Sequence, residues 1–158
     1  MINYFIRPLE ETDALISCHW RNNPTIWEHT GSRPDIIITH EIELEWIKKV
    51  LLRKDEKRFA ICDSQLDKYI GNAQLTNIED GSAEFHIFIG ETSYWGKGVS
   101  IVATKLILEH AREILKLEKV YSWVSIKNVA SLKMCERSGF RQIEEKDELL
   151  KMSVSLIE

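Results

Sequence analysis

The sequence predicts a mixed α+β fold, in which helices cover both faces of one mostly antiparallel sheet of about six to seven strands. Two observations predict it. First, strand-like and helix-like runs follow the order β-α-α-β-β-β-α-β-α-β along the chain. Second, the dipeptide Asp80-Gly81 joins two strand-like runs in the first half, which is typical of an antiparallel hairpin. The second half connects its strands through helices instead, so the sheet is expected to be mixed.

The expected elements of the first half are a strand, a helix, a loop, a second helix and three strands, at residues 2–7, 12–21, 22–35, 39–53, 58–63, 68–78 and 82–90. Pro8 closes the first strand, and Thr12 and Thr39 are suitable N-caps for the two helices. The stretch NNPTIWEHTGSRPD between the helices is rich in turn-forming residues, which predicts the loop.

The expected elements of the second half are a helix, a strand, a helix and a final strand, at residues 98–116, 119–125, 128–139 and 151–157. Asn128 is the expected N-cap of the second of these helices, and Gly139 its C′ residue, followed by the apolar anchor Phe140. The sequence contains no internal repeat, linker or low-complexity segment, so residues 1–158 are expected to form a single domain.

Composition and charge limit the classes of function. The chain has 158 residues, of which 44% are hydrophobic and 29% charged, as in an ordinary globular protein. Its net charge is −4 and it has no basic stripe, so nucleic acid is not expected as a partner. The sequence has neither a signal-peptide pattern nor an apolar run of about 20 residues, so no membrane association is expected. Three scattered cysteines, Cys18, Cys62 and Cys135, predict a reducing cytoplasmic location without disulfides or a metal site.

The stretch YWGKGVS lies between the strand expected at 82–90 and the helix expected at 98–116. Backbone N–H groups at a helix start lack intrahelical partners, and the helix dipole adds partial positive charge there. Gly96 and Gly98 would let a phosphate approach the backbone, and Lys97 adds a cation. The same glycines could equally form an ordinary turn. The stretch is neither a Walker loop nor a dinucleotide-binding fingerprint, because GxxxxGK[ST] and GxGxxG are both absent.

Three segments, AEFHIFI, SYWGKGVSIVATKLILEHA and NVASLKMCERSGF, together resemble the GNAT superfamily of acyl-CoA N-acyltransferases in their order and spacing. The resemblance covers nearly the whole chain and is strongest over residues 82–140. The loop pattern of that family is Arg/Gln-x-x-Gly-x-Gly/Ala. Trp95, Gly98 and Ser100 occupy its defined positions here, so the first and last positions depart from the pattern. YWGKG, the NxxSxxxCExxGF helix and the early WRNNP look most like the RimJ/RimL-type branch, which includes acetyltransferases of ribosomal-protein N-termini, polyamines and amino sugars.

The resemblance implies that acetyl-CoA is the co-substrate and that the sheet splays between the strands at 82–90 and 119–125 to admit it. The loop amides would hold the pyrophosphate, while the backbone at 87–89 would pair with the pantetheine arm and polarise the thioester carbonyl. The residues expected to bind acetyl-CoA are Ile87, Phe88, Ile89, Trp95, Gly96, Lys97, Gly98, Val99, Ser100, Asn128 and Ser131. Asn128 has two interpretations: it caps its helix only, or it also reaches the pantetheine arm.

Acetyl transfer to an amine needs a group that takes a proton and a proton donor for the leaving thiolate. Strand alternation places Glu84, His86 and Phe88 on one face. The resemblance implies that Glu84 is a catalytic or substrate-orienting acid, and the alternative is a surface residue. His86 is the weaker candidate, because a lone histidine on a strand is more often structural or exposed. Cys135 stands where the family usually has a tyrosine acid, so its thiol is either a candidate general acid or a small buried apolar group.

The first third of the chain is expected to bind the amine acceptor, through Trp20, Arg21, Asn22, Trp27 and His29. Aromatic residues could equally belong to the core, and for Trp20 the core is the favoured interpretation. Arg21 would suit an anionic group on the acceptor.

Three alternating acids on the second helix, Glu41, Glu43 and Glu45, are typical of a solvated face. A cationic polyamine becomes a plausible acceptor if several of them face the pocket instead. The sequence does not decide between these interpretations.

We therefore expect an acetyl-CoA-dependent N-acetyltransferase that needs no metal and acts by direct attack of a primary amine on the thioester. The acceptor would be an amino sugar, a polyamine or a protein N-terminus. The alternative is a CoA-binding sensor or interaction module with weak or no catalysis, which the missing tyrosine favours. The protein is expected to be a cytoplasmic monomer or homodimer.

Overall fold

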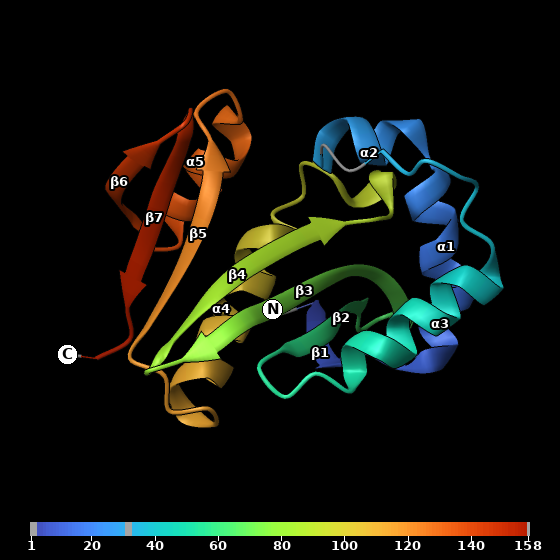
Figure 1. Ribbon diagram of the computed structural model, residues 1–158, viewed down its shortest axis with the longest axis horizontal. Helices are drawn as coiled ribbons and strands as arrows, with labels where there is room; N and C mark the ends of the chain where they lie inside the picture. The colour runs from blue at the N-terminus through green and yellow to red at the C-terminus, as the bar shows by residue number, and fades with distance from the viewer. Residues whose placement is uncertain (1–2, 31–32, 158) are drawn as a thin grey trace.

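The computed structural model describes residues 3–30 and 33–157. Along the chain, the strands and α-helices follow the order β1, α1, α2, α3, β2, β3, β4, α4, β5, α5, β6 and β7 (Figure 1). Their bounds are, in the same order, Tyr4–Pro8, Ala14–Asn22, Pro24–Thr30, His40–Leu51, Lys57–Asp63, Lys68–Glu79, Ser82–Ile89, Val99–Glu113, Lys119–Ser125, Val129–Arg137, Arg141–Lys146 and Leu149–Ser155. Most predicted elements are therefore confirmed to within a few residues. The first strand was predicted to begin at residue 2, which lies outside the described residues.

Within the part of the chain that the structure describes, all the strands join in one seven-stranded sheet in the order β1-β2-β3-β4-β5-β7-β6. Neighbouring strands pair antiparallel except β4 and β5, which pair parallel. Asp80 and Gly81 both have positive φ, at 49° and 77°, which is the geometry of a tight hairpin turn between β3 and β4. The predicted mixed and mostly antiparallel sheet is thus confirmed.

Each face of the sheet carries its own hydrophobic core. On one face, α4 contributes Ala103 and Ile107 to a core that also contains Phe85 and Val120. On the other face, Trp20 of α1 and Ile47 of α3 pack with strand residues in a second core. Figure 1 shows the same division, with α1, α2 and α3 gathered at one side and α4 passing behind β4. Helices therefore cover both faces, as predicted.

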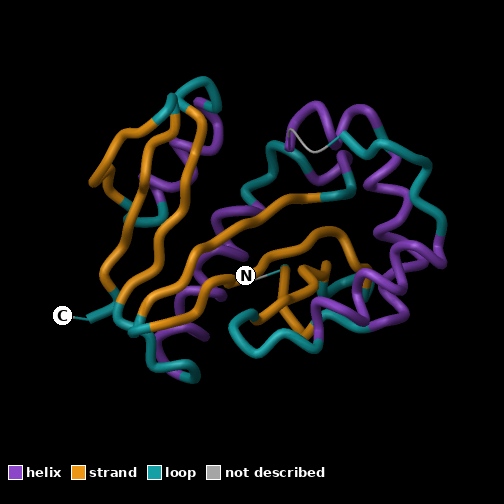
Figure 2. Tube along the Cα trace, viewed as in Figure 1, coloured by secondary structure: helices purple, strands orange, loops and turns teal. Residues whose placement is uncertain are grey.

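The parallel ladder between β4 and β5 is short. It contains only the pairs Ser82–Lys119, Ala83–Val120 and Glu84–Tyr121. Just beyond the last pair, Ser122 Oγ donates a hydrogen bond to the carbonyl of Phe85 at 2.9 Å. From there the two strands diverge, so the sheet opens as a V (Figures 1 and 2). This is the predicted splay.

Two elements correct the expectations from sequence. The predicted loop at 22–35 contains the helix α2, because Pro24 occupies its first position, where a missing N–H costs no hydrogen bond. The side chain of Asn23 accepts from the amide of Thr25, and Ile26 is buried. The strand β6 was not predicted, because all six of its residues are exposed and give no apolar alternation. It forms a hairpin with β7 through two residues of positive φ, Asp147 and Glu148.

Candidate active site

A pocket of about 890 Å³ crosses the sheet where β4 and β5 diverge. Its walls come from three groups of residues: the helices α1 to α3, the strands β3 and β4, and the β5–α5 region with the start of β7. The lining residues are Arg21, Ile26, Trp27, Glu28, Glu43, Trp46, Asn72, Gln74, Phe85, His86, Ile87, Phe88, Ser122, Trp123, Val124, Ser125, Lys127, Asn128, Ser131, Met134, Cys135 and Leu149. Because they come from both faces of the sheet, one substrate can enter from the α4–α5 face and the other from the α1–α3 face.

The strand β4 forms the central wall of this pocket. Beyond Glu84 it keeps its β3 partner, up to the pair Gly71–Ile89, but its ladder with β5 has ended. Its β5-facing backbone groups over 86–88 can therefore pair with an extended ligand, as an edge strand does. Ile89 is a partial exception, since its carbonyl already accepts a hydrogen bond from Trp95 Nε1 at 2.8 Å. Trp95 thus fixes the turn after β4.

The glycine turn before α4 has the geometry of an anion site. Gly96 and Gly98 have φ of 75° and 78°, in the left-handed region that favours glycine. A Cβ built on either residue would meet nothing within 4 Å, so a bulky group has room to approach the backbone. Gly98 is also the N-cap of α4, so the free amides of the first helical turn, from Val99 and Ser100 onward, face this space. The turn therefore fits the pyrophosphate of acetyl-CoA.

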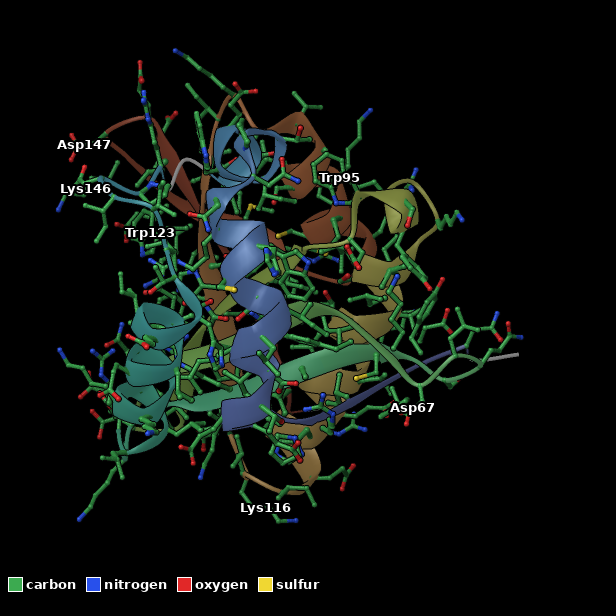
Figure 3. All side chains as sticks on the ribbon, turned by 90° about the vertical axis from the view of Figure 1, so that its right-hand side faces the viewer. Asp67, Trp95, Lys116, Trp123, Lys146 and Asp147 are labelled. Carbon is green, nitrogen blue, oxygen red and sulfur yellow. The ribbon has the colours of Figure 1, made fainter. Side chains whose placement is uncertain are left out.

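The flanking residues of the turn have more ordinary roles. The Val99 side chain is buried, so only its backbone is available to a ligand. Lys97 Nζ lies 5.7 Å from the ring centre of Tyr94, which in turn donates to Asp63 Oδ2 at 2.7 Å. Figure 3 shows Trp95 and Trp123 toward the end of the molecule where β4 and β5 diverge, and Lys116 at the opposite end. The turn thus lies at the open end of the V.

Glu84 and His86 form a pair at the vertex of the V. Their side chains lie on the same face of β4, and His86 Nε2 is 2.8 Å from Glu84 Oε2. The His86 side chain is 43% exposed and lines the pocket, whereas the Glu84 side chain is 19% exposed and is outside the set of described lining residues. Asn77 Nδ2 donates to the other carboxylate oxygen of Glu84 at 3.4 Å. The imidazole, and not the carboxylate, is the group that faces the pocket.

Cys135 and its neighbours on α5 line the opposite wall. Cys135 is a free thiol only 2% exposed, and burial raises its pKa to about 11. It is therefore protonated at neutral pH and buried among apolar groups. Asn128 Oδ1 accepts from the amide of Ser131 at 3.1 Å, which confirms its role as the N-cap of α5. Asn128 and Ser131 also line the pocket.

A buried carboxylate lies at the α1–α3 end of the pocket. Glu43 is 1% exposed, and its two oxygens accept from Ser17 Oγ at 2.7 Å and from Arg21 Nη1 at 2.8 Å. The expectation that Glu43 belongs to a solvated face was wrong. The spacing could have shown this, because Glu43, Ile47 and Val50 recur at i, i+4 and i+7 and share the buried face of α3. Arg21 is neutralised by Glu43, so it does not supply a free positive charge to an anionic acceptor.

The other predicted acceptor residues separate into core and pocket. Trp20 is a core residue, 4% exposed, and its ring leaves no space for a Cβ on Gly90. Asn22 is structural, because its amide group exchanges hydrogen bonds with the backbone N–H and carbonyl of Ile38, both at 2.7 Å. The favoured interpretation of Trp20 as a core residue is thus confirmed, and the prediction that Asn22 lines the acceptor pocket is wrong. Trp27 lines the pocket as predicted. His29 lies in α2, but its side chain lies outside what the structure describes.

Several pocket residues were not singled out from the sequence. Trp46 and Trp123 add aromatic surface, Asn72 and Gln74 add polar groups from β3, and Glu28 adds a carboxylate from α2. The sequences of β3 and β5 do not show which of their side chains line the pocket and which belong to the hydrophobic core. Within the described residues, no cluster of His, Cys, Asp and Glu side chains is arranged to hold a metal ion. None of the described helices is long and apolar enough to span a membrane.

Comparison with known proteins agrees with this site. Residues 4–141 match the sequence model of the Acetyltransferase (GNAT) domain. The Probable N-acetyltransferase YjcK of Bacillus subtilis (strain 168) is 30% identical over 146 residues, which cover 87% of this chain and 80% of that protein. The Spermidine N(1)-acetyltransferase of Escherichia coli (strain K12) is 26% identical over 136 residues, which cover 85% and 71%.

A solved structure is also similar over almost the full length of the chain. It is spermidine N-acetyltransferase from Vibrio cholerae in complex with CoA and spermine, with a TM-score of 0.85 and 25% identity, covering 98% of this chain and 96% of that one. The chain therefore belongs to the GNAT acetyltransferase domain family, and it is an N-acetyltransferase that uses acetyl-CoA to acetylate an amine.

Proposed function

We propose that the acceptor is a polyamine, whose primary amine attacks the thioester of acetyl-CoA directly. The observation that supports this most is the α1–α3 end of the pocket. Two tryptophans of this end, Trp27 and Trp46, line the pocket together with the exposed carboxylate of Glu28, whereas the carboxylate of Glu43 is already paired with Arg21. Aromatic faces and carboxylates both attract alkylammonium groups.

Two further considerations favour a polyamine over an amino sugar or a protein N-terminus. The cation that would have recognised a sugar phosphate, Arg21, is already paired with Glu43 at 2.8 Å. Two of the similar proteins act on spermidine according to their names. The sequence resemblance to the RimJ/RimL-type branch is compatible with all three acceptors, because that branch contains acetyltransferases of each kind.

Direct attack is favoured over an acyl-enzyme because the thiol among the described lining residues is a poor nucleophile. Cys135 is the thiol that lines the slot, and burial raises its pKa to about 11, so the reactive thiolate is scarce. What the chain supplies instead is placement. The edge of β4 would hold the pantetheine arm, an amide of that edge would polarise the carbonyl, and the Gly96–Gly98 turn would hold the pyrophosphate.

The family membership and the imidazole facing the pocket support catalysis over a role as a CoA-binding sensor. We also propose that residues 1–158 act as one catalytic domain in the cytoplasm. The oligomeric state, monomer or homodimer, stays a prediction.

The test is the rate of CoA release from acetyl-CoA with a panel of acceptors: spermidine, an amino sugar and a peptide N-terminus. We expect kcat/KM for spermidine to exceed that for the other two by about tenfold or more, equivalent to about 1.4 kcal/mol. A preference for the amino sugar or the peptide would contradict the polyamine assignment.

Variants at the proposed acceptor end sharpen this test. Glu28→Gln should raise KM for spermidine by about two- to fivefold, because an exposed charge interaction contributes about that much to binding. KM for acetyl-CoA should stay unchanged. Glu45→Gln is the matched control, since Glu45 is an exposed carboxylate that does not line the pocket.

A further inference from the structure

The side chains of Glu84 and His86 are in direct contact, which their residue types alone did not predict. We infer that His86 carries the proton of the reaction, first as base toward the amine and then as acid toward the leaving sulfur, and that Glu84 positions it. This inference rests on the proposed transfer of acetyl to a primary amine. It reverses the order of importance that the sequence suggested, in which Glu84 was the main candidate and His86 the weaker one.

The position of the pair along β4 explains the division of roles. Glu84 is the last residue of β4 held in the parallel ladder, opposite Tyr121. His86, two residues later on the same face, is beyond the ladder and lines the open pocket. One side chain is thus held at the vertex and the other reaches the space where the substrates would meet. Their exposed fractions, 19% and 43%, agree with this arrangement.

The contact between the two side chains also assigns the nitrogen atoms. A carboxylate oxygen accepts protons in hydrogen bonds, so at 2.8 Å the proton belongs on His86 Nε2. In the neutral imidazole, Nδ1 then has the free lone pair, and it is the atom that can accept a proton from the amine. The negative charge of Glu84 stabilises the imidazolium that results. A carboxylate also orients a histidine base in serine hydrolases, where the two nitrogens have the opposite roles, since the carboxylate there contacts Nδ1 and Nε2 is the base.

The second half of the inference follows from the state of Cys135. Donation by this thiol would leave a thiolate at a position that is 2% exposed, which is a costly place for a charge. Its raised pKa, about 11, points the same way, since a departing thiolate whose thiol has the ordinary pKa of 9.0 is too weak a base to take the proton from it. The departing sulfur therefore needs another donor, and a protonated imidazole is a far stronger acid than a buried thiol.

His86 alone can account for both proton transfers of the reaction. The amine nitrogen forms a bond to the thioester carbon, and its proton passes to His86 Nδ1. The bond from that carbon to sulfur then breaks, the electron pair stays on sulfur, and the proton passes from His86 to it. The products are the amide and the free thiol of CoA, and the imidazole returns to its starting state. The nitrogen and the sulfur are attached to the same carbon, so one imidazole beside that carbon can serve both.

The surroundings of His86 are compatible with this role. Gln74 faces it across the β3–β4 ladder, and Trp123 lines the same pocket. Tyr121, opposite Glu84, keeps its phenolic proton, because burial and the charges of Glu84 and Glu79 raise its pKa. Among the described groups at this vertex, the carboxylate of Glu84 is the one in contact with the imidazole.

The experiment compares kcat and KM of wild type and variants at saturating spermidine. His86→Gln should lower kcat by about 100-fold, a typical general acid–base contribution, while KM for acetyl-CoA stays within about twofold. Because His86 is 43% exposed, the variant is expected to fold, and its melting temperature checks this. His40→Gln is the matched control, since His40 is exposed and outside the pocket lining, and its kcat should equal that of wild type.

A second readout separates chemistry from structure. Imidazole added to the buffer should restore part of the turnover of His86→Ala and should leave wild type unaffected. Glu84→Gln should lower kcat by about tenfold in wild type but have no further effect in the His86→Gln background, because a positioning residue acts only through its partner. Glu45→Gln is the control for the loss of a carboxylate.

The outcomes are distinct. A His86→Gln variant with kcat within threefold of wild type, or with no rescue of His86→Ala by imidazole, overturns the role of His86. An equal effect of Glu84→Gln in both backgrounds overturns its positioning role. If wild type itself releases no CoA with any amine, the proposed function fails, and the inference fails with it.

Discussion

At the scale of single residues, Gly98 combines a left-handed backbone conformation with open space beside its Cα. Comparison with Gly81 separates the effects of these two properties. It holds φ at 78° and has nothing within 4 Å of the position of a Cβ. Gly81 in the β3–β4 turn has nearly the same φ, 77°, but lies at the closed end of the sheet beside Glu118. An alanine at either site adopts the same unfavourable left-handed conformation, at a cost of about 1–2 kcal/mol.

The two glycines therefore give a matched pair of variants. Gly98→Ala should raise the Kd for acetyl-CoA by about tenfold or more, because the methyl group would fill the space expected to hold the pyrophosphate. Gly81→Ala should lose similar stability but bind acetyl-CoA as wild type does. Titration calorimetry measures both values, and equal affinities would remove the phosphate role from the turn.

Cys135 gives a prediction on rate. Cys135→Ala should cost about 1 kcal/mol of stability and leave kcat within about twofold of wild type, since the thiol is a buried space-filling group. Steady-state kinetics and denaturant unfolding measure the two quantities. A well-folded alanine variant with kcat reduced more than tenfold would restore the thiol as the general acid.

The same residue gives a prediction on pH. Its pKa rises on folding from the ordinary 9.0 to about 11, so folding favours the neutral thiol. This contribution to stability is complete below about pH 9 and is lost as the pH rises to about 11. The free energy of unfolding should therefore fall less steeply over this range in Cys135→Ala than in wild type. Identical slopes would show that the thiol does not titrate differently in the folded state.

At the scale of elements, the caps of two helices test whether Asn128 also binds a substrate. Asn128 Oδ1 accepts from the amide of Ser131 at 3.1 Å at the start of α5, and Thr39 Oγ1 accepts from that of Ile42 at 3.2 Å at the start of α3. Substitution of either by alanine should lower the free energy of unfolding by about 1 kcal/mol. Only Asn128 lines the pocket, so only Asn128→Ala should also raise KM for acetyl-CoA. If KM is unchanged in both, Asn128 is a cap alone.

Elements also show what could be predicted from the sequence. Runs with a strong period or a clear turn, such as β3, the Asp80-Gly81 turn and β4, were predicted closely, because local geometry and burial favour the same structure. The helix α2 was missed because its first residue, Pro24, is also a turn signal. The strand β6 was missed because it is entirely exposed, so its formation depends on pairing with β7 and on no local pattern.

The candidate site shows the same limit. The glycine turn, and the placement of Glu84 and His86 on one face of β4, were predicted from local sequence. The ion pair of Glu43 with Arg21, and the hydrogen bond from Ser17 to Glu43, depend on how α1 and α3 pack against one another. These are contacts between segments more than 20 residues apart in sequence. A buried polar residue within an apolar helical face was the signal available for Glu43.

At the scale of the whole molecule, the two halves of the sheet are joined at the vertex of the V by a three-pair ladder between β4 and β5. The pocket crosses the sheet at this junction, so acetyl-CoA from one face and the amine from the other would meet beside His86. This arrangement is the physical basis of the direct transfer proposed above. It would bring both substrates together, and the thiol of Cys135 beside them is buried and protonated at neutral pH.

Mass spectrometry of the quenched reaction tests this central claim most directly. After a single turnover with acetyl-CoA and spermidine, we expect acetylated spermidine and free CoA in equal amounts, with the mass of the protein unchanged at every time point. An acetylated protein that forms before the product, or CoA release without acetylated amine, would contradict direct transfer in this pocket.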